Sequence, residues 1–180
     1  MHRRELVALL AGTLAVPEEL MALGRAVHRR ARASTLRALN VHQDETVATI
    51  AELIIPETDT PGARAAGVPA FIEVILAEWA DDADRQRVVS GLASVDQRSN
   101  DLFGKNFTAC APPQQAQILT ALDAEVARLR DTSAKPSQHF FYVIKRLTLI
   151  GYYTSEAGAT AEQHYQIIPG RYEPCYPLES

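Results

Sequence analysis

The sequence has little cysteine, no apolar run long enough to cross a membrane and no excess of positive charge. Each of these absences excludes a class of protein or site. Two cysteines among 180 residues cannot build a disulfide framework or a four-cysteine zinc site. The apolar stretch from Leu6 to Val16 is too short for a bilayer, which takes about 20 residues. A formal net charge of −4 argues against a general nucleic-acid-binding protein.

The motifs that mark common catalytic and cofactor sites are also missing. The chain has no His-Glu-x-x-His, Cys-x-x-Cys, Gly-x-Ser-x-Gly or Gly-x-Gly-x-x-Gly sequence. No glutamate is followed three residues later by histidine, which excludes the di-iron signature of helix bundles. His42 and His139 are expected to be surface or partly satisfied side chains. The sequence therefore predicts no catalytic residue and no metal ligand.

What is present is the composition of a globular domain, with 47% hydrophobic and 22% charged residues. From residue 36 to residue 180 we predict one all-α domain, a compact bundle of about five helices with a long irregular C-terminal tail. Asn40 and Gln43 form a capping-box pattern at the start of the first helix, which Pro56 ends. The other helices are expected from about Pro69, over Asp84–Phe107, from Pro112 and from Ser137. Their apolar faces contain Phe71, Ile72, Ile75, Leu76 and Trp79; Val88, Leu92, Val95, Leu102 and Phe103; Ile118, Leu119, Leu122, Val126 and Leu129; and Phe140, Phe141, Ile144, Leu147 and Leu149.

The first 35 residues have two interpretations. Residues 1–33 carry six arginines and three glutamates, a net charge of +3, whereas the remaining 147 residues carry twelve basic and nineteen acidic side chains. Arg3 and Arg4 precede the apolar stretch as in a twin-arginine export signal, and Ala31-Arg32-Ala33 resembles a cleavage site. The alternative is an amphipathic helix from Arg4 to Ala33 that packs on the domain or on a partner.

The last 29 residues, from Tyr152 to Ser180, break the helical pattern. Three prolines and two glycines disfavour a long helix in this segment. The segment also contains five of the six tyrosines of the chain. Because tyrosine is enriched at protein interfaces, we expect the tail either to fold back over its own bundle or to dock on a partner. Cys175 in the tail has three alternatives: a bridge to Cys110, a bond to another subunit, or a free thiol.

Two segments of the chain resemble the gluconate 2-dehydrogenase subunit 3 family. The first runs from His42-Gln43 and Thr46-Val47 through Ala51-Glu52-Leu53-Ile54-Ile55-Pro56 and Thr58-Asp59-Thr60-Pro61-Gly62-Ala63 to Ala66-Gly67-Val68. The second contains Leu147-Thr148-Leu149-Ile150-Gly151-Tyr152-Tyr153-Thr154-Ser155-Glu156, then Pro169-Gly170-Arg171-Tyr172 and Cys175. The resemblance covers about residues 36–178, and the two motifs occur in the family's order.

The resemblance implies a small, non-catalytic subunit of a membrane-associated sugar or polyol dehydrogenase. In that family the large subunit is a flavoprotein of the glucose–methanol–choline type that carries FAD, and a multihaem cytochrome c often accepts the electrons. The implied chain binds no cofactor itself; FAD, and an iron–sulfur cluster or haem where present, belong to its partners. The small subunit is thought to escort the folded partner through the twin-arginine route, which implies a periplasmic complex, or a cytoplasmic one if the signal is degenerate.

The resemblance and the clustered tyrosines together suggest the residues that contact the partner. We expect the interface to contain Tyr152, Tyr153, Glu156, Tyr165, Pro169, Gly170, Tyr172 and Tyr176, with Cys175 as the cysteine of an interchain disulfide.

Two competing interpretations make different predictions. A freestanding helical binding module would cover its own bundle with the tail and have no obligate partner. An independent enzyme would use Glu57 and Asp59 in the turn after Pro56, or Glu156, but a solvated turn explains Glu57 and Asp59 as well.

Overall fold

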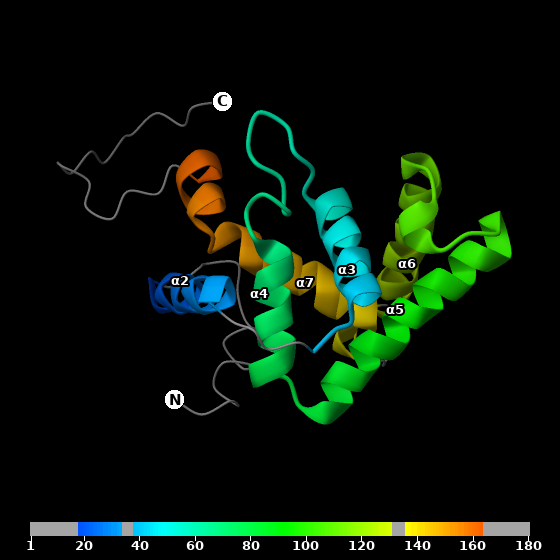
Figure 1. Ribbon diagram of the computed structural model, residues 1–180, viewed down its shortest axis with the longest axis horizontal. Helices are drawn as coiled ribbons and strands as arrows, with labels where there is room; N and C mark the ends of the chain where they lie inside the picture. The colour runs from blue at the N-terminus through cyan, green and yellow to red at the C-terminus, as the bar shows by residue number, and fades with distance from the viewer. Residues whose placement is uncertain (1–17, 34–37, 131–135, 164–180) are drawn as a thin grey trace.

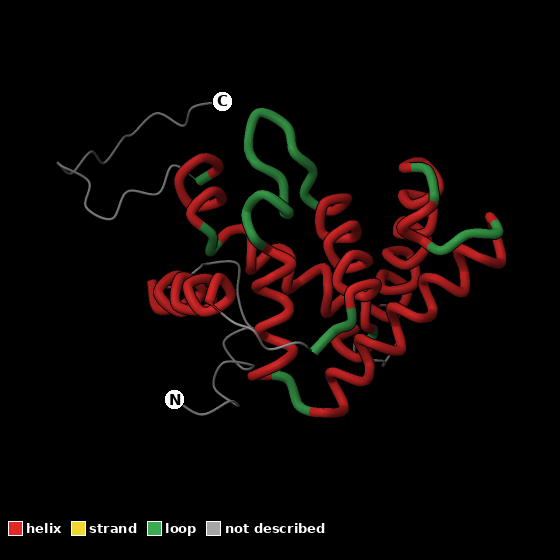
Figure 2. The backbone as a smooth tube through the Cα atoms, viewed as in Figure 1, coloured by secondary structure: helices red, strands yellow, loops and turns green. Residues whose placement is uncertain are grey.

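A computed structural model describes residues 18–33, 38–130 and 136–163, and every regular element among them is helical (Figures 1 and 2). The all-α prediction is therefore confirmed. In chain order the elements are α2 (Glu18–Ala33), α3 (Val41–Ile54), α4 (Val68–Val74), the π-turn η1 (Ile75–Trp79), α5 (Asp82–Phe103), the 3-10 turn η2 (Phe107–Ala109), α6 (Pro112–Arg130), the 3-10 turn η3 (Pro136–Gln138), α7 (Phe140–Tyr153) and the π-turn η4 (Gly158–Glu162).

Local signals in the sequence set the ends of α3 and the start of α6. The Asn40 side chain accepts a hydrogen bond from the Gln43 backbone N–H at 2.9 Å, and the Gln43 side chain accepts one from the Asn40 N–H at 3.0 Å. This capping box satisfies two amides that a helix start leaves without partners. Pro56 follows the end of α3, and α6 begins at Pro112, where a proline costs no helical hydrogen bond.

The prediction that the third helix continues to Phe107 is wrong. Helix α5 ends at Phe103 because Gly104 adopts the left-handed conformation, with φ 68°, and its N–H bonds to the Asn100 carbonyl. Phe107 lies instead in η2, where it is fully buried. Leu102, expected on the apolar face, is 59% exposed, because the last turn of α5 extends beyond the helices that cover its earlier turns.

The prediction that the irregular segment begins at Tyr152 is wrong. Tyr152 and Tyr153 are the last two residues of α7, and residues up to Gln163 form a turn followed by η4. The prolines that argue against a helix all lie at position 169 or beyond, so they do not act on this segment. Residues 164–180 lie outside the described part of the chain.

Helix α7 lies at the centre of the bundle. It contacts α2, α3, α4, α5 and α6, and in Figure 1 it runs behind α4 and α3. Such a position suits a helix that is apolar on most of its circumference. Its buried residues are Phe140, Phe141, Ile144, Leu147, Thr148, Gly151 and Tyr152. Ile50, Ile72, Leu92 and Leu122, from the other helices, are fully buried in the same core.

Helix α2 packs against α4 and α7 (Figure 1). Met21 and Val27 are buried, and the buried His28 donates from Nε2 to the Gly151 carbonyl at 2.7 Å. The His28 ring also lies against the Phe71 ring, with 4.9 Å between ring centroids and an angle of 32° between the ring planes. Residues 18–33 are thus an integral helix of the domain. Residues 1–17, with Arg3 and Arg4, lie outside the described residues.

Candidate partner interface

Three of the residues expected at a partner interface can be placed in the structure. Tyr152, Tyr153 and Glu156 lie at the C-terminal end of α7 and in the turn after it. Tyr165, Pro169, Gly170, Tyr172, Cys175 and Tyr176 lie outside the described residues, as do Arg3 and Arg4. The described interface candidates therefore belong to one end of the molecule.

Tyr152 joins the two sequence segments that carry the family resemblance. Its side chain is only 1% exposed, and its hydroxyl donates to the Pro61 carbonyl at 2.9 Å. The bond crosses from α7 to the loop after α3, so segments ninety residues apart in sequence meet in space (Figure 1). Because its ring is enclosed by its own chain, Tyr152 offers a partner no surface. The neighbouring Tyr153 is half-buried and Glu156 is exposed.

One carboxylate bonds to two points of the loop between α3 and α4, in addition to backbone hydrogen bonds such as that from the Ala63 N–H to the Ile55 carbonyl. Glu52 Oε1 accepts a hydrogen bond from the Glu57 N–H at 3.0 Å, and its Oε2 accepts one from the Arg64 N–H at 2.9 Å. A side chain on residue 62 would displace this clamp, because a Cβ on Gly62 would lie 2.3 Å from Glu52 Oε1. The role of Glu52 was not predicted from the sequence. Its position one turn before Pro56, at the start of a turn-rich loop, was the available signal.

An ion pair extends the same arrangement along α3. The Arg64 guanidinium donates to both oxygens of Glu45, at 2.7 and 3.2 Å. These hydrogen bonds hold the pKa of the Glu45 carboxyl below its ordinary value. Both side chains are exposed, so water screens the pair and its contribution to stability is small.

The turn after α7 is fixed by Ser155. Its hydroxyl donates to the Tyr152 carbonyl at 2.6 Å and accepts the Gly158 N–H at 3.0 Å. With the Glu52 clamp, this turn fixes both segments at one end of the bundle. We call the two segments, residues 52–67 and 151–158, the signature end. Its outward side contains Glu57, Thr58, Asp59 and Glu156, which are all exposed.

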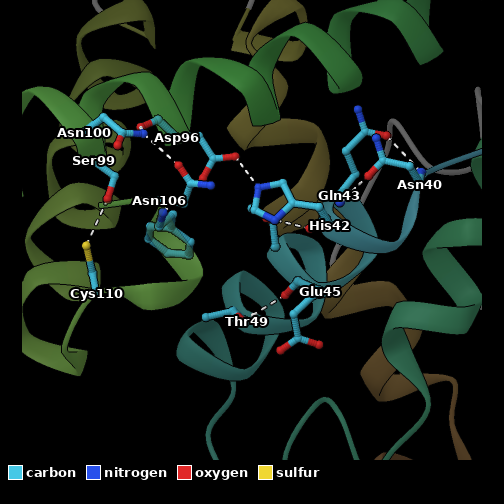
Figure 3. Close-up of polar contacts among 12 residues, drawn as sticks. Asn40, His42, Gln43, Glu45, Thr49, Asp96, Ser99, Asn100, Asn106 and Cys110 are labelled. Carbon is cyan, nitrogen blue, oxygen red and sulfur yellow. Dashed lines mark hydrogen bonds and ion pairs between the residues drawn. The ribbon is translucent and has the colours of Figure 1, made fainter. Parts of the chain in front are cut away.

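The described residues that most resemble a catalytic arrangement lie elsewhere, between α3 and α5 (Figure 3). His42 Nε2 is 2.5 Å from Asp96 Oδ2, and Asp96 Oδ1 accepts the Phe107 N–H at 2.9 Å. Ser99 and the buried Cys110 form a separate pair, with 3.0 Å between Oγ and Sγ. A catalytic serine or cysteine lies within hydrogen-bonding distance of its general base. Neither Ser99 nor Cys110 forms a hydrogen bond with His42 in any described contact. The His42–Asp96 pair joins α3 to α5.

The described part of the chain contains no group of side chains placed to hold a metal ion and no helix that could span a membrane. Within residues 18–33, 38–130 and 136–163, no group of three or more His, Cys, Asp or Glu side chains is placed to hold a metal ion. None of the described helices is long and apolar enough to cross a bilayer. Glu57 and Asp59 are exposed, and Asp59 accepts the Thr58 hydroxyl at 3.0 Å.

We expect replacement of Glu52 by glutamine to loosen the signature end. Glutamine keeps the size of the side chain but presents an NH₂ donor to one of the two backbone donors, at a cost of about 1–2 kcal/mol. Hydrogen exchange should show faster exchange at the Glu57 and Arg64 amides. Glu57→Gln is the matched control, because that exposed side chain clamps nothing in the described contacts. Unchanged exchange in Glu52→Gln would contradict the clamp.

Comparison with known proteins identifies one family. The family model described as gluconate 2-dehydrogenase subunit 3 matches residues 41–170. No curated protein and no solved structure matches the chain. The matched range begins at the first residue of α3 and contains the whole signature end.

Proposed function

The chain belongs to the gluconate 2-dehydrogenase subunit 3 family, and from this membership we propose that it is the non-catalytic small subunit of a sugar or polyol dehydrogenase complex. The observation that carries the proposal is the contact between the two family-like segments, made by Tyr152 and Pro61. This contact builds a fixed end of the bundle with exposed polar groups. Such an arrangement suits recognition of another protein.

The partner in this proposal is a catalytic flavoprotein of the glucose–methanol–choline type. Its FAD, and any iron–sulfur cluster or haem of a cytochrome c subunit, would belong to the partner chains. The present sequence supports that division, because it has no Gly-x-Gly-x-x-Gly motif with which to hold a dinucleotide.

The proposed work of the small subunit is to stabilise the catalytic chain by burying part of its surface. A specific interface buries about 1,600 Å² in total, and an obligate one buries more. Within the described residues, Tyr153 and Glu156 at the signature end can contribute to it. Tyr165, Pro169, Gly170, Tyr172 and Tyr176 would add the tail, and Cys175 would form a disulfide to the partner.

We also propose that the small subunit escorts the folded partner to the periplasm. The support is the Arg3-Arg4 pair followed by an apolar stretch, which resembles a twin-arginine signal. In this proposal the complex associates with the membrane through its other subunits.

Gentle purification of the tagged small subunit from its native host tests these proposals. We expect a co-purifying chain of flavoprotein size and a flavin absorbance spectrum. If Cys175 is bonded to the partner, the two chains should migrate together on a gel only without reductant. In the same strain, Arg3→Lys with Arg4→Lys should retain both chains in the cytoplasm. A lone, colourless small subunit would refute the subunit role and favour the freestanding module.

A further inference from the structure

One face of α2 is buried against the rest of the domain. Four buried residues lie on this face: Met21, Gly24, Val27 and His28. The opposite face contains the exposed residues Glu19, Ala22, Ala26 and Arg29. The buried face packs on α4 and α7, beside the signature end (Figure 1). Helix α2 therefore docks on the domain by a single face.

That face contacts the last turn of α7. His28 Nε2 donates to the Gly151 carbonyl at 2.7 Å. This carbonyl is one of the four that the C-terminal end of an α-helix leaves without a partner in the helix itself. Close by, Gly24 lies against Thr154, because a Cβ on residue 24 would overlap the Thr154 side chain. Helix α2 thus completes the end of α7.

The same turn of α7 contacts the loop after α3. Tyr152 directly follows Gly151, and its hydroxyl donates to the Pro61 carbonyl at 2.9 Å. Adjacent residues of a helix point about 100° apart, so this one turn contacts α2 and the loop together. Because both residues lie in a single hydrogen-bonded turn, displacement of Gly151 from α2 also displaces the Tyr152 ring from Pro61.

A second connection between α2 and the loop passes through Phe71 on α4. The His28 ring lies against the Phe71 ring. A Cβ on Gly151 would lie 2.9 Å from Phe71 Cδ1, so α4 and α7 are in close contact at this point. The Phe71 N–H bonds to the carbonyl of Gly67, the last residue of the loop, at 3.1 Å. Phe71 therefore connects α2 to both segments of the signature end.

We propose that α2 acts as a strap on the signature end. By holding the last turn of α7 through His28 and Gly24, it keeps the contact between Tyr152 and Pro61 closed and so sets the shape of this end. The family match begins at Val41, so the strap joins a segment outside the matched range to two segments within it. Coupling between two sites is reciprocal, so a ligand that fixes the signature end also tightens the docking of α2.

In the proposed complex, this coupling links recognition of the partner to the N-terminal part of the chain. This consequence rests on the proposed function, because it takes the catalytic subunit as the ligand of the signature end. His28 is buried in its own chain, so it acts on recognition by positioning the signature end.

Urea unfolding of the full-length chain tests the strap by a double-mutant cycle. No described hydrogen bond or ring contact joins His28 to Tyr152, and residues without shared contacts usually have additive effects on stability. Tyr152→Phe alone should lower the folding equilibrium constant about fivefold, because it removes the bond to Pro61. In the His28→Ala background the same change should lower it less than about twofold, because that bond is already loosened.

Three further variants separate the strap from a general loss of stability. Arg30→Gln is the matched control on α2, because its ion pair is with Glu78 in η1; in that background Tyr152→Phe should keep its full effect. Gly24→Ala pushes α2 away from Thr154 and removes no hydrogen bond, so it should reduce the effect as His28→Ala does. His28→Gln keeps an N–H donor for the Gly151 carbonyl and should restore most of the effect.

The co-expressed complex provides a second readout. Mass photometry over a dilution series gives the apparent dissociation constant for the catalytic subunit. His28→Ala should raise this constant severalfold, whereas Arg30→Gln should leave it within about twofold of wild type, since its exposed ion pair contributes little.

The proposal would be overturned if His28→Ala and Gly24→Ala were both additive with Tyr152→Phe, because α2 and the signature end would then be independent. An equal reduction in the Arg30→Gln background would also overturn it, since the effect would not pass through the last turn of α7. Unchanged affinity of the His28→Ala complex would refute the action of the strap on recognition. Failure of the wild-type chain to capture any flavoprotein would refute the proposed function, whereas the cycle in the isolated chain would still decide whether the strap exists.

Discussion

Deletion of residues 1–33 is expected to destabilise the domain by about 5 kcal/mol. The deletion removes the buried side chains of Met21 and Val27, each of which contributes about 1.5–3 kcal/mol, and the His28 hydrogen bond to Gly151, which contributes about 1 kcal/mol. It also exposes the surface of Phe71 on which His28 lies. Because whole domains are stable by only about 5–15 kcal/mol, the shortened chain should be largely unfolded or aggregated.

Urea unfolding of the full chain and of two deletions measures this effect. Deletion of residues 1–17 stops before α2 and is the control; it should retain most of the free energy of unfolding. Equal stability of the two deletions would show that α2 adds nothing to the domain.

The same packing bears on processing of the N-terminal segment. A cut after Ala33 would remove α2 from a domain that uses it. The intact mass of the small subunit from its native host should therefore place the N-terminus at or before Glu18.

Replacement of Tyr152 by alanine is expected to cost about 4 kcal/mol, as for other large buried aromatic side chains. For a chain of this size, that cost corresponds to a fall in Tm of about 10 °C. Tyr152→Phe keeps the ring and loses the hydroxyl, with its hydrogen bond to the Pro61 carbonyl at 2.9 Å and its longer contact with Thr60 Oγ1 at 3.4 Å, so it should cost about 1 kcal/mol. Thermal unfolding followed by circular dichroism gives both values.

A substitution of the neighbouring Tyr153 separates an effect on folding from an effect on partner binding. Tyr153→Ala removes a half-buried side chain and should change Tm much less than Tyr152→Ala, while it weakens capture of the catalytic subunit. Loss of capture in Tyr152→Ala would instead follow from loss of the fold. A Tyr152→Ala variant with the Tm of wild type would contradict the burial of this ring.

Much of the fold could be predicted because its determinants are local. The Asn40–Gln43 capping box, the break at Pro56 and the start of α6 at Pro112 depend on a few neighbouring residues. The end of α5 was predicted wrongly, although its determinant is also local. Gly104 adopts the left-handed conformation and ends the helix, whereas the apolar Phe107 was expected to continue the apolar face of the helix.

The candidate interface could be predicted only in part. The sequence identified the segment that contains Tyr152, Tyr153 and Glu156, but it treated the two tyrosines alike.

The sequence by itself determined that this chain is all-α, where most of its helices start, and that two separated segments carry the family likeness. Only the tertiary structure decided which side of each helix is covered. Adjacent residues on a helix point about 100° apart, so Tyr152 faces the loop at Pro61 while Tyr153 does not. The partners of a residue also come from chain that is distant in sequence: the Gly151 carbonyl accepts a hydrogen bond from His28, and the Tyr152 hydroxyl donates one to the Pro61 carbonyl.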